Sequence, residues 1–450
     1  MKIVLVICML LALTAVSVSA GSIKMHSSGR YFQDASGKPV FLIGYYSWAS
    51  VAPGYYNDSP QRYVDMIEKG SPYGVNYLRF SLGINALGGK GKHHWELEPT
   101  PTAFPYINGK VDLNQWNKVF WDGLRYHAEL AKKHGVILHV CLFDGVDIRG
   151  GNQQHRWINS FWNVKNQVKD YYGDLDVNND GNADQNGEFY RADDFKSNTG
   201  VGRYQRKLID KAIEVTKGYD NVFYEVGNEM LGSRADWNAA VVDYVKSKTK
   251  KAITQNGGRL AYNAEGWSDH SPDTPADIKD TLDNLVGKGC PFWYDPDGSH
   301  LMQASSDDLR RSVWYSFAGG AAGWGGFVDD YWMCEFSVET ATYYKNLAKF
   351  IEESGAKFWE MTPQHDLVSN PKVNSCLAKT SSEYVIYVLN DPTVTVNLND
   401  ITNKAVCRTY NPKTGVWGDE QIMDGAGRRT INRPADADDW AIYIRAGGKQ

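Results

Sequence analysis

The chain has 450 residues, of which 42% are hydrophobic and 22% charged, with a formal net charge of −5 and a pI of about 6.1. This composition is typical of a globular protein with a large core, and it excludes a disordered chain, a collagen and a membrane transporter. The slightly acidic charge gives no electrostatic reason to bind nucleic acid or an anionic membrane, and we expect a monomer.

The first twenty residues have the pattern of a signal peptide. Lys2 supplies a positive charge, an apolar run follows, and residues 18–20 (Val-Ser-Ala) form a small-residue cleavage site. The apolar run is too short to cross a bilayer comfortably. We therefore expect residues 1–20 to be removed and the protein to be secreted or periplasmic.

Short apolar strands alternate with amphipathic helices through the first four-fifths of the chain, which predicts a parallel α/β architecture. The predicted strands are residues 40–46, 75–80, 136–143, 222–226, 259–263, 283–286, 291–294 and 325–328. The predicted helices are residues 60–69, 112–134, 203–217, 237–253, 307–317 and 338–353, with Asp112 as the cap of the second.

Eight strands alternating with helices over about 340 residues fit the size of a (β/α)₈ barrel. A doubly wound sheet is the alternative, but no Gly-x-Gly-x-x-Gly nucleotide turn follows the first strand. After residue 361 helical periodicity ends, and short alternating strands separated by Asn, Pro, Gly and Asp turns begin. We therefore predict a catalytic barrel over residues 21–361 and a small antiparallel β-sandwich over residues 362–450.

Five cysteines remain after the signal peptide, which is too few for a disulfide scaffold, and no Cys-x-x-Cys metal spacing occurs. Cys376 and Cys407 lie in neighbouring predicted strands and are the most plausible pair. Buried free thiols fit the sequence equally well.

Polar and aromatic residues cluster where the predicted strands end. In a barrel of this type the active site lies at the C-terminal ends of the strands. The residues found there, in chain order, are Trp48, Arg79, Asp144, Asn228, Glu229, Glu265, Trp267, Asp295, Asp297, His300, Trp324 and Trp332. Two carboxylates flanked by aromatic rings are what glycoside hydrolysis requires, and that chemistry needs no cofactor.

Glu229 is the strongest catalytic candidate. It closes a Gly-Asn-Glu sequence directly after the fourth predicted strand, with Asn228 placed to bind a sugar hydroxyl. The alternative is a surface glutamate at the start of a helix, where the helix dipole favours negative charge.

At this point the sequence resembles a known family. Residues 223–229 (Phe-Tyr-Glu-Val-Gly-Asn-Glu) resemble the fourth-strand acid/base motif of the clan A glycoside hydrolases, which are (β/α)₈ enzymes. Residues 34–48 and 314–326 are similar to segments of the apiosidase-like branch. Residues 410–415 resemble a turn in its C-terminal β domain, sometimes described as collagen-binding. The resemblance implies hydrolysis of a glycosidic bond, with Glu229 as acid/base.

One departure from the family pattern concerns the second carboxylate. The clan usually has a glutamate at the end of strand seven as nucleophile, whereas here the stretch reads Tyr-Asp-Pro-Asp-Gly, and no glutamate occurs between Glu265 and Glu335. Asp295, Asp297 or Glu265 could take its place. An aspartate is one methylene shorter, which can widen the gap between the carboxylates and favour inversion over retention. An ordinary polar turn is the alternative.

The remaining binding candidates are less specific. Arg79 resembles the clan's strand-two arginine, which orients the strand-seven carboxylate, although a buried ion pair would explain it too. Trp48, Trp267, Trp324 and Trp332 are candidate sugar platforms, although each one singly fits core packing better. Asp144 and His300 could bind hydroxyl groups.

A calcium-loop pattern follows the third predicted strand. Oxygen-bearing side chains alternate along it, at Asp176, Asn178, Asp180, Asn182 and Asp184, and a glycine occupies the sixth position. The twelfth position is Gly187 instead of glutamate, so the pattern is closer to helix-free Asp-x-Asn-x-Asp-Gly loops than to an EF-hand. A structural calcium ion is the prediction, and a solvated acidic turn is the alternative.

The sequence therefore predicts a secreted glycoside hydrolase acting on O-glycosidic bonds of a poly- or oligosaccharide. Because the second carboxylate is uncertain from the residues, a catalytically inactive carbohydrate- or matrix-binding protein on the same scaffold is the alternative.

Overall fold

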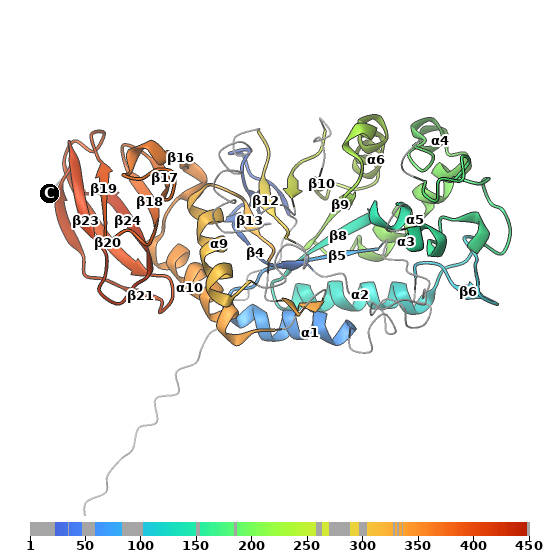
Figure 1. The fold of residues 1–450 in the computed structure, drawn as a ribbon, viewed down its shortest axis with the longest axis horizontal. Helices are drawn as coiled ribbons and strands as arrows, with labels where there is room; N and C mark the ends of the chain where they lie inside the picture. The colour runs from blue at the N-terminus through green and yellow to red at the C-terminus, as the bar shows by residue number, and fades with distance from the viewer. Residues whose placement is uncertain are drawn as a thin grey trace, which may run out of the picture.

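Eight parallel strands close into a barrel in the computed structural model (Figure 1). The structure describes residues 23–34, 36–46, 59–82, 102–149, 154–183, 187–257, 263–269, 289–296, 304–326, 329–330, 333–334 and 336–447. The barrel strands are β4 (Leu42–Tyr46), β5 (Tyr77–Ser81), β8 (Ile137–Asp144), β9 (Val222–Asn228), β10 (Ile253–Asn256), β11 (Trp267–Asp269), β12 (Phe292–Tyr294) and β13 (Gly323–Trp324). Their order around the barrel follows the chain, and β13 pairs with β4 to close it.

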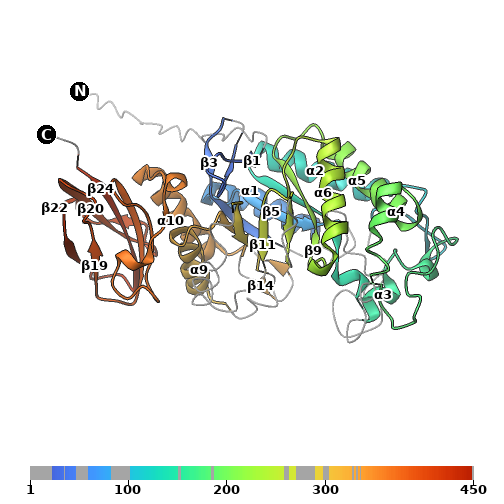
Figure 2. The same cartoon turned by 90° about the horizontal axis from the view of Figure 1, so that it is seen from above.

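Helices cover the outside of the barrel, as the alternating pattern predicts. The larger ones are α1 (Ser59–Gly70), α2 (Lys118–Lys133), α5 (Gly200–Thr216), α6 (Ala235–Lys248), α9 (Ser306–Ala318) and α10 (Val338–Ser354). Two short helices, α3 (Gln154–Asn159) and α4 (Ala192–Ser197), lie between β8 and α5. Figure 2 shows α2, α5 and α6 next to one another around one side of the barrel, where they are in contact.

The second long helix shows how sequence sets these boundaries. Phe120, Leu124 and Ala131 recur at helical spacing and are buried against the barrel. Asn117 caps the helix by accepting a hydrogen bond from the backbone of Val119. The predicted cap, Asp112, is therefore wrong: it lies five residues earlier and stabilises a separate turn.

Three predicted barrel strands needed correction. The fifth strand is β10, because α6 ends at Lys248 and the polar run 253–256 is extended. Residues 259–262 lie outside the described residues, and so does the predicted sixth strand, residues 283–286. The sixth strand is β11, and the eighth is β13, two residues before the predicted start. The polar strand residues misled the prediction because their hydrogen-bond partners are inside the barrel and cannot be read from spacing.

Three small antiparallel sheets are present beside the barrel strands in the described part of the chain. The first contains β1 (Lys24–Met25), β2 (Phe32–Gln33) and β3 (Pro39–Val40). The others are the pair β6 (Tyr106–Ile107) and β7 (Lys110–Val111) and the pair β14 (Asp329–Asp330) and β15 (Met333–Cys334).

The C-terminal part consists of antiparallel sheets, which confirms the predicted β domain. One sheet contains β16 (Thr362–Pro363), β17 (Ser375–Lys379), β18 (Glu383–Leu389), β24 (Asp439–Ala446), β20 (Lys404–Asn411), β21 (Val416–Trp417) and β22 (Gln421–Asp424). The other pairs β19 (Thr393–Asn397) with β23 (Arg428–Asn432). Val394, Val396 and Ile431 of the small sheet pack on Ile386 and Trp440 of the large one.

The outer face of the large C-terminal sheet packs on helix α9 (Figure 1). The ring of Trp314 stacks on that of Tyr387, with centroids 5.9 Å apart. Beside them, Arg310 and Asp439 form a fully buried ion pair of 2.6 Å, and Tyr387 donates a hydrogen bond to the same carboxylate. A buried charge of this kind is tolerated only with its partner present, so the sheet and the barrel depend on each other at this point.

The predicted cysteine pair is not formed. Cys376 in β17 and Cys407 in β20 are both buried free thiols. Burial raises the pKa of the Cys407 thiol to about 12, so it stays protonated. In the described part of the chain, no helix combines the length and apolar character needed to cross a bilayer.

Candidate active site

Glu229 lies immediately after the fourth barrel strand, at the C-terminal end of the barrel. Its backbone is left-handed (φ 48°), a strained conformation for a side chain other than glycine. Two neighbours hold it there. The Asn256 side chain accepts a hydrogen bond from the Glu229 backbone N–H at 3.0 Å. Arg149 binds the Glu229 carboxylate through Nη1 at 2.9 Å and the Glu229 backbone oxygen through Nη2 at 3.1 Å. The side chain keeps 27% exposure, so it stays accessible to a ligand.

Arg79 connects this strand end to the barrel interior. It is fully buried and binds Glu225 with two nitrogens, at 3.1 and 2.5 Å. Its Nη2 also donates to the side-chain oxygen of Asn228 at 3.2 Å, and its Nε lies 3.7 Å from Asp295. The Arg79 guanidinium therefore links Asn228, the neighbour of Glu229, to the carboxylate of Asp295. Its two hydrogen bonds to Glu225 fix the plane of the guanidinium.

Asp295 follows the seventh barrel strand and points into the barrel. Its Oδ2 accepts hydrogen bonds from the Tyr77 hydroxyl at 2.9 Å and the Trp293 indole N–H at 2.8 Å. The residue is fully buried. Gly325, on the neighbouring strand end, makes room for it: a Cβ at that position would lie 2.2 Å from Asp295 Oδ1. The carboxylate thus has a fixed orientation, with only a glycine fitting beside it.

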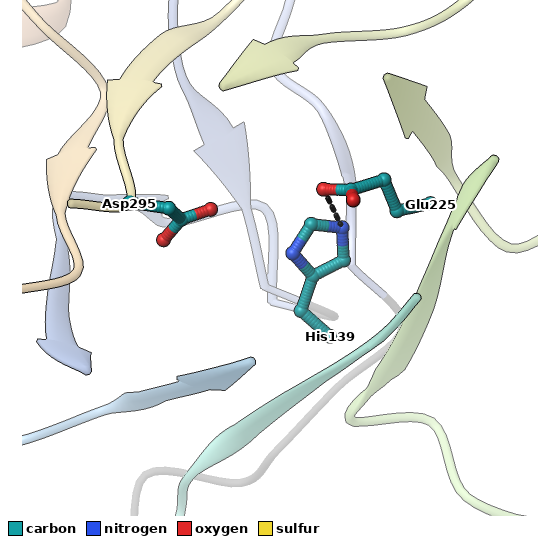
Figure 3. A group of neighbouring side chains, drawn as sticks. All are labelled: His139, Glu225 and Asp295. Carbon is teal, nitrogen blue, oxygen red and sulfur yellow. Dashed lines mark ion pairs between the residues drawn. The ribbon is translucent and has the colours of Figure 1, made fainter. Parts of the chain in front are cut away.

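His139 lies below this carboxylate, where its side chain, Glu225 and Asp295 point toward one another (Figure 3). Its Nδ1 is 2.7 Å from the Tyr77 hydroxyl, and its Nε2 is 2.9 Å from that of Thr254. The Tyr77 hydroxyl thus lies between His139 Nδ1 and Asp295, to which it donates, and His139 Nε2 lies 3.5 Å from a carboxylate oxygen of Glu225 (Figure 3). A hydrogen-bonded chain therefore runs from the imidazole to the carboxylate of Asp295.

His139, Glu225 and Asp295 also offer ligand atoms within 4.8 Å of one another, close enough to hold a metal ion. The positive charge of Arg79 already lies between the two carboxylates. A metal ion would have to displace a buried guanidinium that has two ion-pair partners. The two carboxylates therefore bind Arg79, and this cluster does not fit a metal site.

We expect His139 to make folding stability depend on pH. Burial, together with the positive charge of Arg79, lowers the pKa of His139 well below 6.5. The unfolded chain therefore takes up a proton below pH 6.5 that the folded chain refuses. Stability is fully present above pH 6.5 and falls as the pH drops, by up to about 1.4 kcal/mol per pH unit. Denaturant unfolding between pH 7.5 and 5 should show this slope. His139→Asn should flatten it, and equal slopes would contradict the assignment.

Three predicted site residues are wrong. Trp324 is fully buried, and its indole N–H donates to Tyr344 of helix α10 at 2.8 Å. Trp267 pairs with Gln255 and alternates with Ser268, whose hydroxyl points into the barrel toward Glu225. Both tryptophans therefore face the helical layer. Glu265 accepts a hydrogen bond from the first residue of β10, so it lies at the N-terminal end of the barrel, opposite Glu229.

Two other candidates lie beside the site but are already engaged. Asn228 is fully buried, its amide oxygen accepts from Arg79, and its amide nitrogen lies 3.4 Å from Asp144. Asp144 is also buried and accepts from the backbone of Val146 at 2.9 Å. Both residues support the position of Arg79 and the strand ends. Trp48, Asp297, His300 and Trp332 lie outside the described residues.

Sequence reasoning missed several residues that build the site: Tyr77, His139, Arg149, Glu225, Thr254, Asn256, Ser268, Trp293 and Gly325. Most lie within strands, at alternate positions that point into the barrel. Tyr77 and Arg79, and likewise Thr254 and Asn256, show the two-residue spacing that could have revealed them. Arg149 follows its strand by several residues and gave no such signal.

The predicted calcium loop closes on itself. The Gly181 N–H lies 3.3 Å from both carboxylate oxygens of Asp176, and the Asn178 amide donates to Asp180 at 2.8 Å. Asp176 and Asn182 are buried, whereas Asp184 lies outside the described residues. Calcium binding stays a prediction.

We expect calcium to stabilise the protein. An ion that binds only the folded chain adds about 2.7 kcal/mol at a hundredfold excess over Kd. EDTA should therefore lower Tm, and Asp180→Ala should lower it to the same value and abolish the response to calcium. Identical melting curves in EDTA and in millimolar calcium would favour the acidic turn.

Comparisons with known proteins support the fold. No family model matches the sequence, and no curated protein matches it either. Solved structures do resemble it. One described as a glycoside hydrolase has a TM-score of 0.66 at 13% identity, over 96% of this chain and 98% of that chain. A glycoside hydrolase family 5 protein from Bacteroides vulgatus has a TM-score of 0.65 at 12% identity, over 96% and 94%. A family 5 mannosidase from Rhizomucor miehei covers 74% of this chain at a TM-score of 0.50 and 14% identity.

At these identities the likeness concerns the fold alone. The chain has the (β/α)₈ barrel of these glycoside hydrolases, and the first two alignments extend over the C-terminal sheets.

Proposed function

We propose that the protein is a secreted glycoside hydrolase that cleaves O-glycosidic bonds of a poly- or oligosaccharide with two carboxylates. One observation carries the proposal. Glu229, accessible at the end of the fourth strand, is joined through Asn228 and Arg79 to Asp295 at the end of the seventh. Two solved structures of similar fold, each described as a glycoside hydrolase, support the same reaction class.

Glu229 acts as the acid/base in this proposal. It gives a proton to the leaving oxygen as the glycosidic bond breaks, and it takes a proton from the attacking water or incoming hydroxyl. Arg149 and Asn256 fix its backbone and carboxylate, so its orientation is set before a substrate arrives. Preorganisation of this kind lowers the cost of reaching the transition state.

Asp295 is the second carboxylate. Tyr77, Trp293 and Arg79 donate to or face one of its oxygens, which stabilises its negative charge and fixes its plane. A negative group of this kind stabilises the oxocarbenium-like transition state, either as a nucleophile or as the base for a water. Because Asp295 is fully buried, the proposal requires that substrate binding opens a path to it.

The finer assignment rests on sequence. Residues 34–48 and 314–326 support the apiosidase-like branch, and residues 1–20 support secretion. The sugar and the linkage are left open, and we propose no cofactor for catalysis.

The test is a hydrolysis screen. The chain from residue 21 onward is incubated with a panel of plant and algal polysaccharides, and new reducing ends and oligosaccharide products are measured. We expect at least one polysaccharide to be cleaved by the wild type and not by Glu229→Gln. Cleavage that persists in this variant, or no cleavage of any panel member by a folded wild type, would contradict the proposal.

A further inference from the structure

A groove with a volume of about 670 Å³ lies on the helical layer, and its lining includes none of the residues that surround Glu229. Helix α5 forms its floor. The segment before α2, the end of α4 and helix α6 form its sides. Figure 1 shows α4 and α5 at the end of the molecule opposite the C-terminal sheets. The lining residues are Asn114, Trp116, Asn198, Arg203, Tyr204, Arg206, Lys207, Asp210, Lys211, Glu214, Tyr244 and Lys248. Five are cationic and two are acidic, so the lining carries three net positive charges although the whole chain is acidic.

Three of these cations form a row on one helix face. Arg203, Lys207 and Lys211 follow one another at four-residue spacing in α5, which spans about 12 Å at 1.5 Å per residue. Like charges at this spacing repel one another and destabilise a helix. A negatively charged ligand along the row would convert that repulsion into attraction.

Aromatic rings hold the cations in place. The Lys207 ammonium lies 4.9 Å from the centre of the Trp116 ring, and that of Lys211 lies 5.9 Å from it. On the other side, the Arg206 guanidinium lies 4.5 Å from the ring of Tyr244. Such contacts position a positive charge without neutralising it.

The acidic residues of the groove pair with only part of this charge. Lys211 binds Glu214 at 2.9 Å, and Lys248 binds Asp210 at 3.2 Å. Within the described part of the chain, no carboxylate lies within ion-pair distance of Arg203, Arg206 or Lys207. The Lys207 ammonium instead donates to the backbone oxygen of Leu113, and burial lowers its pKa. Arg206 likewise donates from Nη2 to the backbone oxygen of Lys196 at 2.6 Å. A backbone oxygen does not neutralise a charge, and a guanidinium or an ammonium has further N–H groups for a ligand.

We propose that this groove is a second, non-catalytic binding site for an acidic oligosaccharide, one whose sugar units carry carboxylate or sulfate groups. Arg203, Arg206 and Lys207 bind the anionic groups. The side chains of Asn114 and Asn198 and the carboxylates of Asp210 and Glu214 bind the hydroxyl groups of the sugar units. This ligand class rests partly on the proposed function, since a site remote from Glu229 would raise the local concentration of a polysaccharide substrate.

The mixed lining favours a sugar over a nucleic acid. Asp210 and Glu214 lie among the cations and would repel a continuous phosphate chain. The aromatic rings are also already covered: Phe104 stacks on Trp116 with centroids 5.1 Å apart. Single-stranded nucleic acid needs open aromatic faces for its bases. A ligand with spaced charges and many hydroxyl groups fits better.

Affinity electrophoresis and calorimetry test the proposal on the full chain carrying Glu229→Gln, so that any hydrolysis is slowed about 10²–10⁴-fold. The probes are polygalacturonate for carboxylate, dextran sulfate for sulfate, unmodified dextran as the neutral control, and oligodeoxythymidine. Binding is measured at two salt concentrations because contacts between exposed charges weaken with salt. This readout does not depend on activity, so its failure would leave the proposed hydrolysis unaffected.

A matched pair of variants locates the binding. Arg203→Glu with Lys207→Glu reverses two groove charges. Lys133→Glu with Lys372→Glu makes the same change in net charge at exposed positions outside the groove. We expect the groove variant to weaken binding of one acidic polymer at least tenfold and the control to change it less than twofold.

Because Lys207 is partly buried, Arg203→Glu alone, at an exposed position, is a second variant, expected to weaken binding at least threefold at unchanged Tm. The proposal would be overturned by the absence of binding to both acidic polymers, by equal losses in the two double variants, or by tighter binding of oligodeoxythymidine.

Discussion

Glu229→Gln is expected to reduce kcat on an unactivated polysaccharide by about 10²–10⁴-fold, the usual contribution of a general acid. The amide keeps nearly the same volume and can still accept a hydrogen bond from Arg149, so the fold should not change. What it lacks is a proton that can be transferred to the leaving oxygen. The measurement is kcat on the polysaccharide identified by the screen, together with Tm.

The matched control is Glu129→Gln. Glu129 lies on the exposed face of α2, so the same chemical change occurs far from the barrel interior. Its kcat should equal that of the wild type. If Glu229→Gln retained more than about a tenth of wild-type kcat, another group would have to be the acid.

Gly325→Ala is expected to be the second most damaging change, although it adds one methyl group. The new Cβ would lie 2.2 Å from Asp295 Oδ1, and the backbone cannot move away easily because Gly325 N–H donates to Tyr294 at 2.6 Å. Asp295 must therefore turn away from Tyr77 and Trp293. We expect kcat to fall about 100-fold, since a displacement of about 1 Å has that effect, and stability to fall by about 1–3 kcal/mol.

A double-mutant cycle separates the displacement of Asp295 from general disruption. In an Asp295→Ala background the clashing oxygen is gone, so Gly325→Ala should cost far less stability than in the wild type. Gly218→Ala is the control, because a Cβ there meets nothing within 4 Å. Additive effects of the two substitutions would show that Gly325 does not act through Asp295.

The sequence was sufficient to predict the barrel because its strongest signals are local. Apolar runs such as residues 136–143 and the helical stripe of α2 depend on neighbours three to four residues away. The motif ending in Glu229 is equally local, so its place at a strand end could be predicted. The C-terminal sheets could be predicted for the same reason, from alternation and turn residues.

The interior of the barrel could not be predicted in this way, because its polar residues are stabilised by partners distant in sequence. Thr254 and Asn256 look like a loop in the sequence, yet one contacts His139 and the other holds Glu229. Arg79 was expected to orient the carboxylate after strand seven, but it pairs more closely with Glu225. Sequence periodicity does not reveal which buried cation pairs with which buried carboxylate.

Two tryptophans were predicted to lie in the site but lie outside it. Trp267 is the first residue of β11 and Trp324 the last residue of β13. In a sequence such a position looks the same whether the ring faces the barrel axis or the helices. Only the strand register shows that they face outward.

The ion pair between Arg310 and Asp439 restricts which other domains could be joined to this barrel by recombination. An exchange that joined the barrel to a different apolar domain would leave Arg310 with Asp307 of its own helix but without Asp439. Removing one partner of a buried ion pair typically costs about 3–5 kcal/mol. Loss of the sheets would instead leave the Trp314 side of α9 uncovered. Recombination can therefore pass the barrel and the C-terminal sheets on together more easily than apart. The β domain thus differs from modules joined by flexible linkers, because it shares a buried ion pair and an aromatic contact with a barrel helix.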